Sequence, residues 1–249
     1  MARKLPPADV KILYAKAAGR CAFSSCRVNV VLDGTEGDKS KQIGKIAHIV
    51  AHRPNGPRGD SSFPKEKLDC YDNWMLLCPT CHDVVDAQES EYSTVQLHEI
   101  KNDHESWVFQ QLDESMSEVS FAELEIATKA IASGKHFISG SFHVIPPGKK
   151  IKTNKFTSEV HVLISTGLSR SKEVSDFIVK MAQLDKLFPD RLKDGFNEEY
   201  LKLKETLSGD ALFMAMLDFS QAGQTDFKQQ AASLAILSHL FHICEVFEK

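Results

Sequence analysis

The sequence contains no long apolar run: nowhere do about 18 apolar residues follow one another, the length that a membrane-spanning helix needs. We also expect no secretory signal, because the opening MARKLPPADV has two basic residues and no apolar core. There is no internal repeat and no low-complexity tract. We therefore expect a cytoplasmic globular protein that is not embedded in a membrane.

Cysteine is scarce, with six residues in 249, and without a secretory signal these thiols are not expected to form disulfides. Four of them form two close pairs, Cys21 with Cys26 and Cys78 with Cys81. Zinc favours tetrahedral thiolate sites, and two such turns can supply four sulfur ligands to one ion. Buried free thiols are the alternative, but two pairs within 61 residues favour a structural Zn²⁺ site.

The small net charge of −4 conceals an uneven distribution. Residues 1–67 contain thirteen Lys or Arg and only six Asp or Glu, a local charge of +7. Such a block is a candidate surface for a polyanion. A solvated lysine-rich surface would explain the same charge, so composition alone leaves both readings open.

The pattern of apolar residues changes along the chain. The first part mixes short elements: helices at 8–18, 79–87 and 93–112, a strand at 43–51, and a loop rich in Pro, Gly and Ser at 52–67. The later part reads as helical, with helices expected at 121–132, 174–187, 192–207, 211–219 and 227–247. We predict an α+β fold: a first domain at 1–115, a linker and irregular connection at 116–150, and an all-α domain at 151–249.

Three polar residues accompany the cysteines. If zinc takes all four thiolates, His82, directly after Cys81, is left free for other chemistry. His48 ends the predicted strand, and Asn73 lies between the two histidines. A one-metal nuclease needs such a set: a base that deprotonates water, an asparagine that holds the loop beside that base, and a histidine that binds the metal.

The segments IAHIVAHRPNGPRGD, YDNWMLLCPTCHDVVD and YSTVQLHEIKNDHE together resemble an HNH endonuclease of the ββα-metal fold. The resemblance covers roughly residues 8–108, and the segment is especially similar to HNH domains of bacterial antiphage effectors, including those of CBASS systems. It implies a nuclease acting on double-stranded DNA with Mg²⁺ or Mn²⁺. It implies that His48 is the general base, Asn73 the asparagine that holds the loop, and His82 the ligand of the catalytic metal. It also implies four structural zinc ligands: Cys21, Cys26, Cys78 and Cys81.

One position departs from the family pattern. Many HNH nucleases carry a metal-binding Asp immediately before the first histidine, where this chain has Ala47. Water and the scissile phosphate can fill part of a Mg²⁺ shell. The protein ligands that could replace the aspartate are Asp86, Asp69, Asp60 and His52. His52 is also an alternative base, ranked below His48 because it falls where the loop begins.

Two arginines of the same loop, Arg53 and Arg58, are candidate contacts to the DNA backbone, because guanidinium groups match phosphate geometry. Loop solvation or an ion pair with Asp60 is the alternative explanation of the two arginines. Contacts of this kind position a strand without reading its bases.

The segments SGDALF and CEVFEK, within residues 150–249, resemble the C-terminal domain of ABC-three-component defence proteins, which are related to Lamassu systems. The resemblance implies a helical domain that docks the nuclease onto an SMC-like ABC ATPase, with a third small subunit as a further partner. The last predicted helix is apolar on most sides, which fits either a central core helix or burial by a partner. We expect an antiphage effector nuclease. The alternative, favoured by Ala47, is a catalytically inactive, zinc-containing DNA-binding adaptor.

Overall fold

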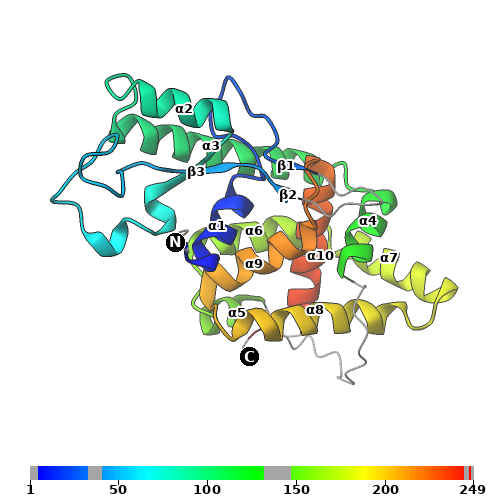
Figure 1. Cartoon of the computed structure of the whole chain (residues 1–249). Coiled ribbons are helices and arrows are strands. Elements are labelled where there is room, and N and C mark those ends of the chain that lie inside the picture. The colour runs from blue at the N-terminus through cyan, green and yellow to red at the C-terminus, as the bar shows by residue number, and fades with distance from the viewer. Residues whose placement is uncertain (1–4, 33–40, 132–146, 244–246, 248–249) are drawn as a thin grey trace. The chain divides into compact units, whose positions relative to one another are not determined.

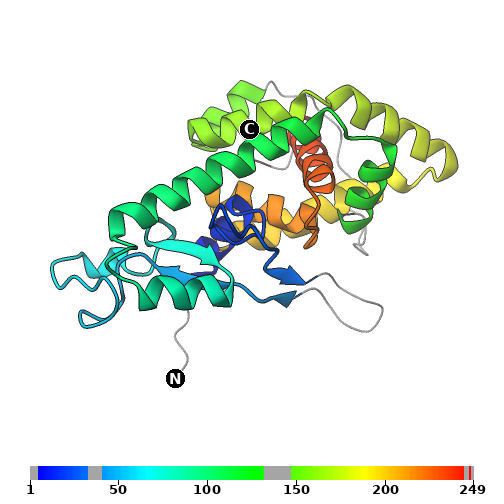
Figure 2. The same ribbon diagram turned by 90° about the horizontal axis from the view of Figure 1, so that it is seen from above.

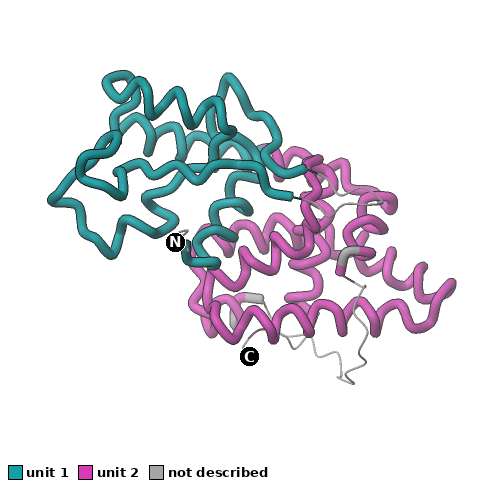
Figure 3. The backbone as a smooth tube through the Cα atoms, viewed as in Figure 1, with its two compact units in different colours: residues 1–110 teal, residues 111–249 magenta. Residues whose placement is uncertain are grey.

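The computed structural model describes residues 5–32, 41–131, 147–243 and 247. The chain divides into two compact units, residues 1–110 and 111–249, shown in different colours in Figure 3. Of the linker and irregular connection expected at 116–150, residues 132–146 lie outside the described residues, and the described residues on either side are mostly helical. Among the helices that are described, none is long and apolar enough to cross a membrane.

The first unit is built from short strands and helices, as the mixed sequence pattern predicted. Its elements in chain order are α1 (Pro7–Lys16), β1 (Val31–Leu32), β2 (Lys41–Gln42), β3 (Lys45–His48), β4 (Trp74–Leu77), α2 (Pro79–Ala87) and the first part of α3 (Thr94–Met116), with two short 3₁₀ turns, η1 (Lys65–Lys67) and η2 (Tyr71–Asn73), in the β3–β4 connection. The strand predicted at 43–51 is shorter than expected, because the chain leaves the ladder after His48.

The core of this unit surrounds β4. All four residues of its WMLL sequence are buried, and Trp74 is fully buried, so its side chain belongs to the core. β4 pairs antiparallel with β3, in a register that places His48 opposite Trp74. Helix α2 packs against both strands, and Figures 1 and 2 show it alongside the ladder. The result is a β–β–α arrangement in which β3 ends at His48 and α2 carries His82, with Asn73 directly before β4.

The second unit is all helical in the residues described. After the end of α3 it contains α4 (Phe121–Ile131), α5 (Pro147–Thr153), α6 (Ser158–Leu168), α7 (Ser171–Leu184), α8 (Phe188–Lys204), α9 (Gly209–Gln221) and α10 (Phe227–Ile243). Helix α10 packs against α4, α6, α7 and α9, and every residue from 230 to 241 is buried. Its apolar character is therefore explained by a central place in this unit, without a partner protein. The chain is thus an α+β protein with an all-α part.

Candidate metal centre and active site

The four cysteines of the two predicted pairs meet in one cluster. The sulfur atoms of Cys21, Cys26, Cys78 and Cys81 all lie within 4.8 Å of one another, and the Cys26 and Cys78 sulfurs are 3.9 Å apart. Four thiolates around one zinc ion, each about 2.3 Å from the metal, would be about 3.8 Å from each other. The donor set and its spacing therefore fit a structural metal site of the zinc type.

Local backbone contacts bring the two cysteine pairs together. The backbone N–H of Ala22 donates to the carbonyl of Leu76 (2.9 Å), which ties the first turn to β4 just before Cys78. The Cys78 side chain also caps α2 by accepting from the N–H of Cys81. Burial raises the pKa of the Cys21 thiol to about 11. Holding all four sulfurs as thiolates at neutral pH therefore requires a cation among them.

A half-buried arginine anchors the first cysteine turn to α3. The guanidinium of Arg27 donates to the carbonyl of Ala22 (2.9 Å) and lies 4.4 Å from the centre of the Trp107 ring. It also contacts Nδ1 of the buried His104, whose Nε2 lies 3.2 Å from the carbonyl of Ala17. His104 is best described as a neutral ring that donates from Nε2 and accepts at Nδ1. These contacts give the histidine a structural role.

His48, the last residue of β3, has two different partners on one ring nitrogen. Its Nε2 lies 3.0 Å from a carboxylate oxygen of Asp69 and 3.1 Å from Nε1 of Trp74. A protonated Nε2 can donate to the carboxylate, and an unprotonated Nε2 can accept from the indole N–H. Each protonation state of His48 thus has a partner already in place. That arrangement suits a residue that takes up and releases a proton, the requirement for a general base.

Asn73 closes the loop that separates β3 from β4. Its side-chain oxygen accepts from the N–H of Val50 (2.8 Å), and its side-chain nitrogen donates to the carbonyls of Val50 (2.9 Å) and Leu68 (3.0 Å). The side chain is buried, so these bonds are not exchanged with water. The Asn73 amide therefore joins the start of the loop, at Val50, to its later part, at Leu68. Val50 lies two residues after His48, so the loop is fixed close to that histidine.

The substitution Asn73→Asp tests this closure. Aspartate keeps the size and the acceptor, but it loses the two donated bonds and places a carboxylate in a buried site. We expect the free energy of unfolding to fall by about 2 kcal/mol, measured by urea denaturation of the zinc-loaded protein. Asn55→Asp is the matched control, because Asn55 is exposed in the same loop. Equal stabilities for the two variants would contradict the proposed closure.

A buried lysine supports the segment that carries Asn73. Nζ of Lys101, on α3, donates to the carbonyls of Tyr71 (2.6 Å) and Trp74 (2.9 Å), on either side of Asn73. Glu105 lies 3.7 Å from the same nitrogen. Burial lowers the pKa of Lys101 to about 8, from an ordinary 10.5. The sequence did not reveal this role, because a lysine within a polar helix face is normally solvated.

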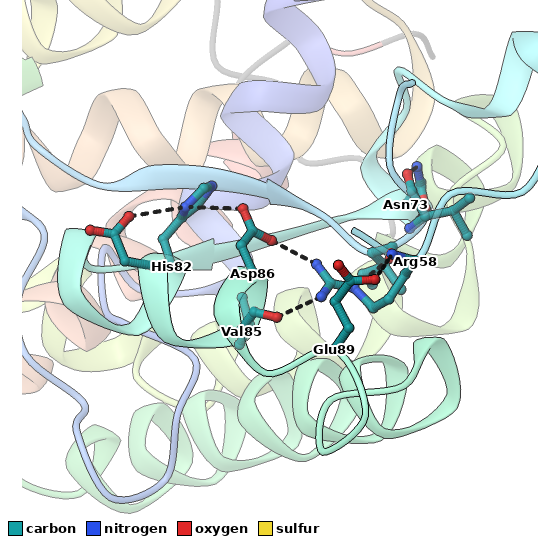
Figure 4. A network of polar contacts seen from close by, with 9 residues as sticks. Arg58, Asn73, His82, Val85, Asp86 and Glu89 are labelled. Atoms are coloured by element: carbon teal, nitrogen blue, oxygen red, sulfur yellow. Dashed lines mark hydrogen bonds and ion pairs between the residues drawn. The ribbon is translucent and has the colours of Figure 1, made fainter. Parts of the chain in front are cut away.

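His82 lies on α2 beside two linked side chains, shown in Figure 4. Its Nδ1 is 3.6 Å from Oδ2 of Asp86, one helical turn later. The other oxygen of Asp86 accepts from Nη2 of Arg58 at 2.9 Å. Arg58 also donates to the carbonyls of Val85 (2.6 Å) and Ile49 (3.1 Å). The arginine therefore joins the His82 helix to the residue that directly follows His48.

These contacts change the role expected for Arg58. Its side chain is only 4% exposed and its guanidinium is bonded within the unit, so it is better explained as a positioning residue than as a phosphate contact. The carboxylate partner of Arg58 is Asp86 and not Asp60. The Asp60 carboxylate instead accepts from the N–H and the hydroxyl of Ser62. Arg53 and His52 are exposed, and the ring of His52 lies 6.5 Å from that of His48.

Beyond the four-cysteine cluster, no group of three or more potential metal ligands occurs among the residues that the structure describes. A catalytic ion would therefore be held by few protein atoms, with His82 and Asp86 the closest pair on α2. No protein-family model matches the chain, and no curated protein matches it. The functional assignment consequently rests on this geometry and on the sequence resemblance.

Proposed function

We propose that the chain is a metal-dependent HNH endonuclease that hydrolyses phosphodiester bonds in double-stranded DNA. The observation that carries the proposal is the arrangement around the β3–β4 ladder. His48 ends one strand, Asn73 precedes the other and locks the loop beside His48, and α2 follows with His82. The zinc-type cluster at the start of α2 fixes the helix relative to the strands.

In this mechanism His48 accepts a proton from water, and the water oxygen attacks phosphorus while one P–O bond to sugar breaks. Asp69 then receives the hydrogen bond from protonated Nε2. A divalent cation bound by His82, Mg²⁺ or Mn²⁺, would neutralise charge on the phosphate and on the leaving oxygen. The exposed Arg53 supplies a phosphate contact at the edge of the same loop.

The direct test is cleavage of supercoiled plasmid with Mg²⁺ or Mn²⁺ by the zinc-loaded protein. We expect His48→Ala to lower the cleavage rate by about 100-fold or more, the usual contribution of a general base. His52→Ala, which alters the exposed neighbouring histidine, is expected to retain most activity. The reverse order of effects would assign the base to His52.

Ala47 favours a second candidate, a zinc-containing DNA-binding adaptor without catalysis. This residue is buried in the core of the first unit, so β3 supplies no carboxylate ligand there. An adaptor would bind plasmid in a gel-shift assay and leave it intact with either metal. Retention of zinc and of DNA binding, without cleavage, would support the adaptor in place of the nuclease.

For the second unit we propose docking onto an SMC-like ABC ATPase of an antiphage defence complex, a role supported by the resemblance of residues 150–249. A docked nuclease would be restrained until the ATPase responds to foreign DNA. The plasmid assay should therefore be repeated with that ATPase and its third small subunit present. Cleavage by the lone chain at the full rate of the complex would count against restraint.

A further inference from the structure

The metal site of the proposed nuclease needs a carboxylate that β3 does not provide. Ala47 is 1% exposed, and its methyl group belongs to the apolar core. Divalent cations such as Mg²⁺ and Mn²⁺ prefer oxygen ligands, and one imidazole alone holds them weakly. Another residue must therefore supply an anionic oxygen close to His82.

Of the acidic residues considered from the sequence, two are engaged elsewhere. Asp69 lies against Nε2 of His48. Asp60 accepts two hydrogen bonds from Ser62, at 2.7 and 2.6 Å. Asp86 differs from both, because its Oδ2 lies 3.6 Å from Nδ1 of His82 on the same helix.

We propose that Asp86 is the carboxylate ligand of the His82 metal ion and that Arg58 holds it in the binding orientation. This assignment rests on the nuclease proposed above. At 3.6 Å the two atoms are too far apart for a hydrogen bond to each other. Neighbouring ligands of an octahedral ion with bonds of about 2.1 Å are about 3 Å apart, so small side-chain rotations suffice to bind one ion.

The contacts of Arg58 explain why Asp86 can act in this way. One carboxylate oxygen is fixed by the guanidinium at 2.9 Å, which leaves the other on the side of His82, as Figure 4 shows. Hydrogen bonding of a ligating carboxylate by a neighbouring side chain orients it for the metal. The same guanidinium reaches the carbonyl of Ile49, so the metal pair and the His48 strand are held by one residue.

The loop around Arg58 is shaped for this contact. Arg58 has a positive φ of 55°, an uncommon conformation for a residue with a side chain. Gly59 follows it, and a Cβ there would lie 2.2 Å from the carbonyl oxygen of Pro54, so only glycine fits. A strained turn that directs an arginine inward is expected where its contacts matter.

The test compares Asp86→Asn with Asp83→Asn in the zinc-loaded full chain. Asp83 is a matched control, because its carboxylate lies 3.7 Å from the same nitrogen but is 86% exposed. Binding of Mn²⁺ is measured by electron paramagnetic resonance of the unbound ion. We expect Asp86→Asn to weaken binding about tenfold or more, Asp83→Asn to stay within about twofold, and His82→Ala to abolish the site.

Water proton relaxation separates a ligand from a residue that only orients His82. Loss of a ligand lets an additional water bind Mn²⁺, so relaxivity per bound ion should rise in Asp86→Ala, which unlike Asp86→Asn has no amide oxygen to replace the carboxylate. Weaker Mn²⁺ binding without a rise in relaxivity would show that Asp86 is not a ligand. Equal effects of Asp86→Asn and Asp83→Asn on Mn²⁺ binding would show the same. Either result would leave the proposed nuclease standing. Absence of any His82-dependent Mn²⁺ binding in the wild type would overturn the proposed nuclease as well.

Discussion

Cys78→Ser is expected to empty the four-cysteine cluster and to unfold the first unit. Cys78 contributes one of the four clustered sulfur atoms, caps α2 and directly follows the buried strand β4. Structural zinc contributes about 10 to 16 kcal/mol of apparent binding free energy in small zinc domains. We therefore expect the zinc content to fall from about one ion per chain to nearly none, with a loss of more than about 3 kcal/mol in unfolding free energy. Metal analysis and urea denaturation measure the two quantities.

Cys70→Ser is the control for this experiment. The Cys70 thiol lies in the same unit but outside the cluster, and it donates to the carbonyl of Lys67 at 3.1 Å. Its replacement should leave the zinc content unchanged. If both serine variants retain zinc, the cluster does not hold the ion, and if both lose it, the effect is not specific to the cluster.

The features predicted well from the sequence are those fixed by local rules. Helix α2 begins and ends at the predicted residues, because Pro79 occupies its first turn and Cys78 caps it. The cysteine pairs likewise identify their own cluster, since few arrangements other than a shared metal bring two such turns together. For α10 the sequence allows either a central core helix or burial by a partner protein. Its packing against four other helices shows that it is a central core helix.

The features that could not be predicted depend on long-range contacts. Arg58 lies in a polar loop with Gly and Pro, and its spacing does not show that its guanidinium reaches Asp86, 28 residues later. Asp69 and His48 are 21 residues apart and meet only when the loop folds back. The burial of Lys101 on a polar helix could not be predicted either. In each case a charged side chain of a type that normally faces solvent forms a contact with a residue far away in the sequence.

Gly167→Ala is expected to destabilise the second unit strongly. A Cβ at Gly167, in α6, would lie 2.2 Å from Oγ of Ser238 and 2.7 Å from the carbonyl oxygen of Leu234, both in α10. Rotation of the serine can relieve the first clash, but the second involves backbone, so the two helices must separate. The better helix propensity of alanine, about 1 kcal/mol, is smaller than this cost. We expect a net loss of about 3 kcal/mol in unfolding free energy.

Gly148→Ala is the matched control, because it also replaces a helical glycine of the second unit. A Cβ at Gly148 would meet no atom within 4 Å, so only the propensity term remains. This variant should be as stable as the wild type or more stable by up to about 1 kcal/mol. Urea denaturation followed by circular dichroism compares the two. If Gly167→Ala is as stable as Gly148→Ala, α6 and α10 are not in the close contact described, and the central packing of α10 must differ from that shown in Figure 1.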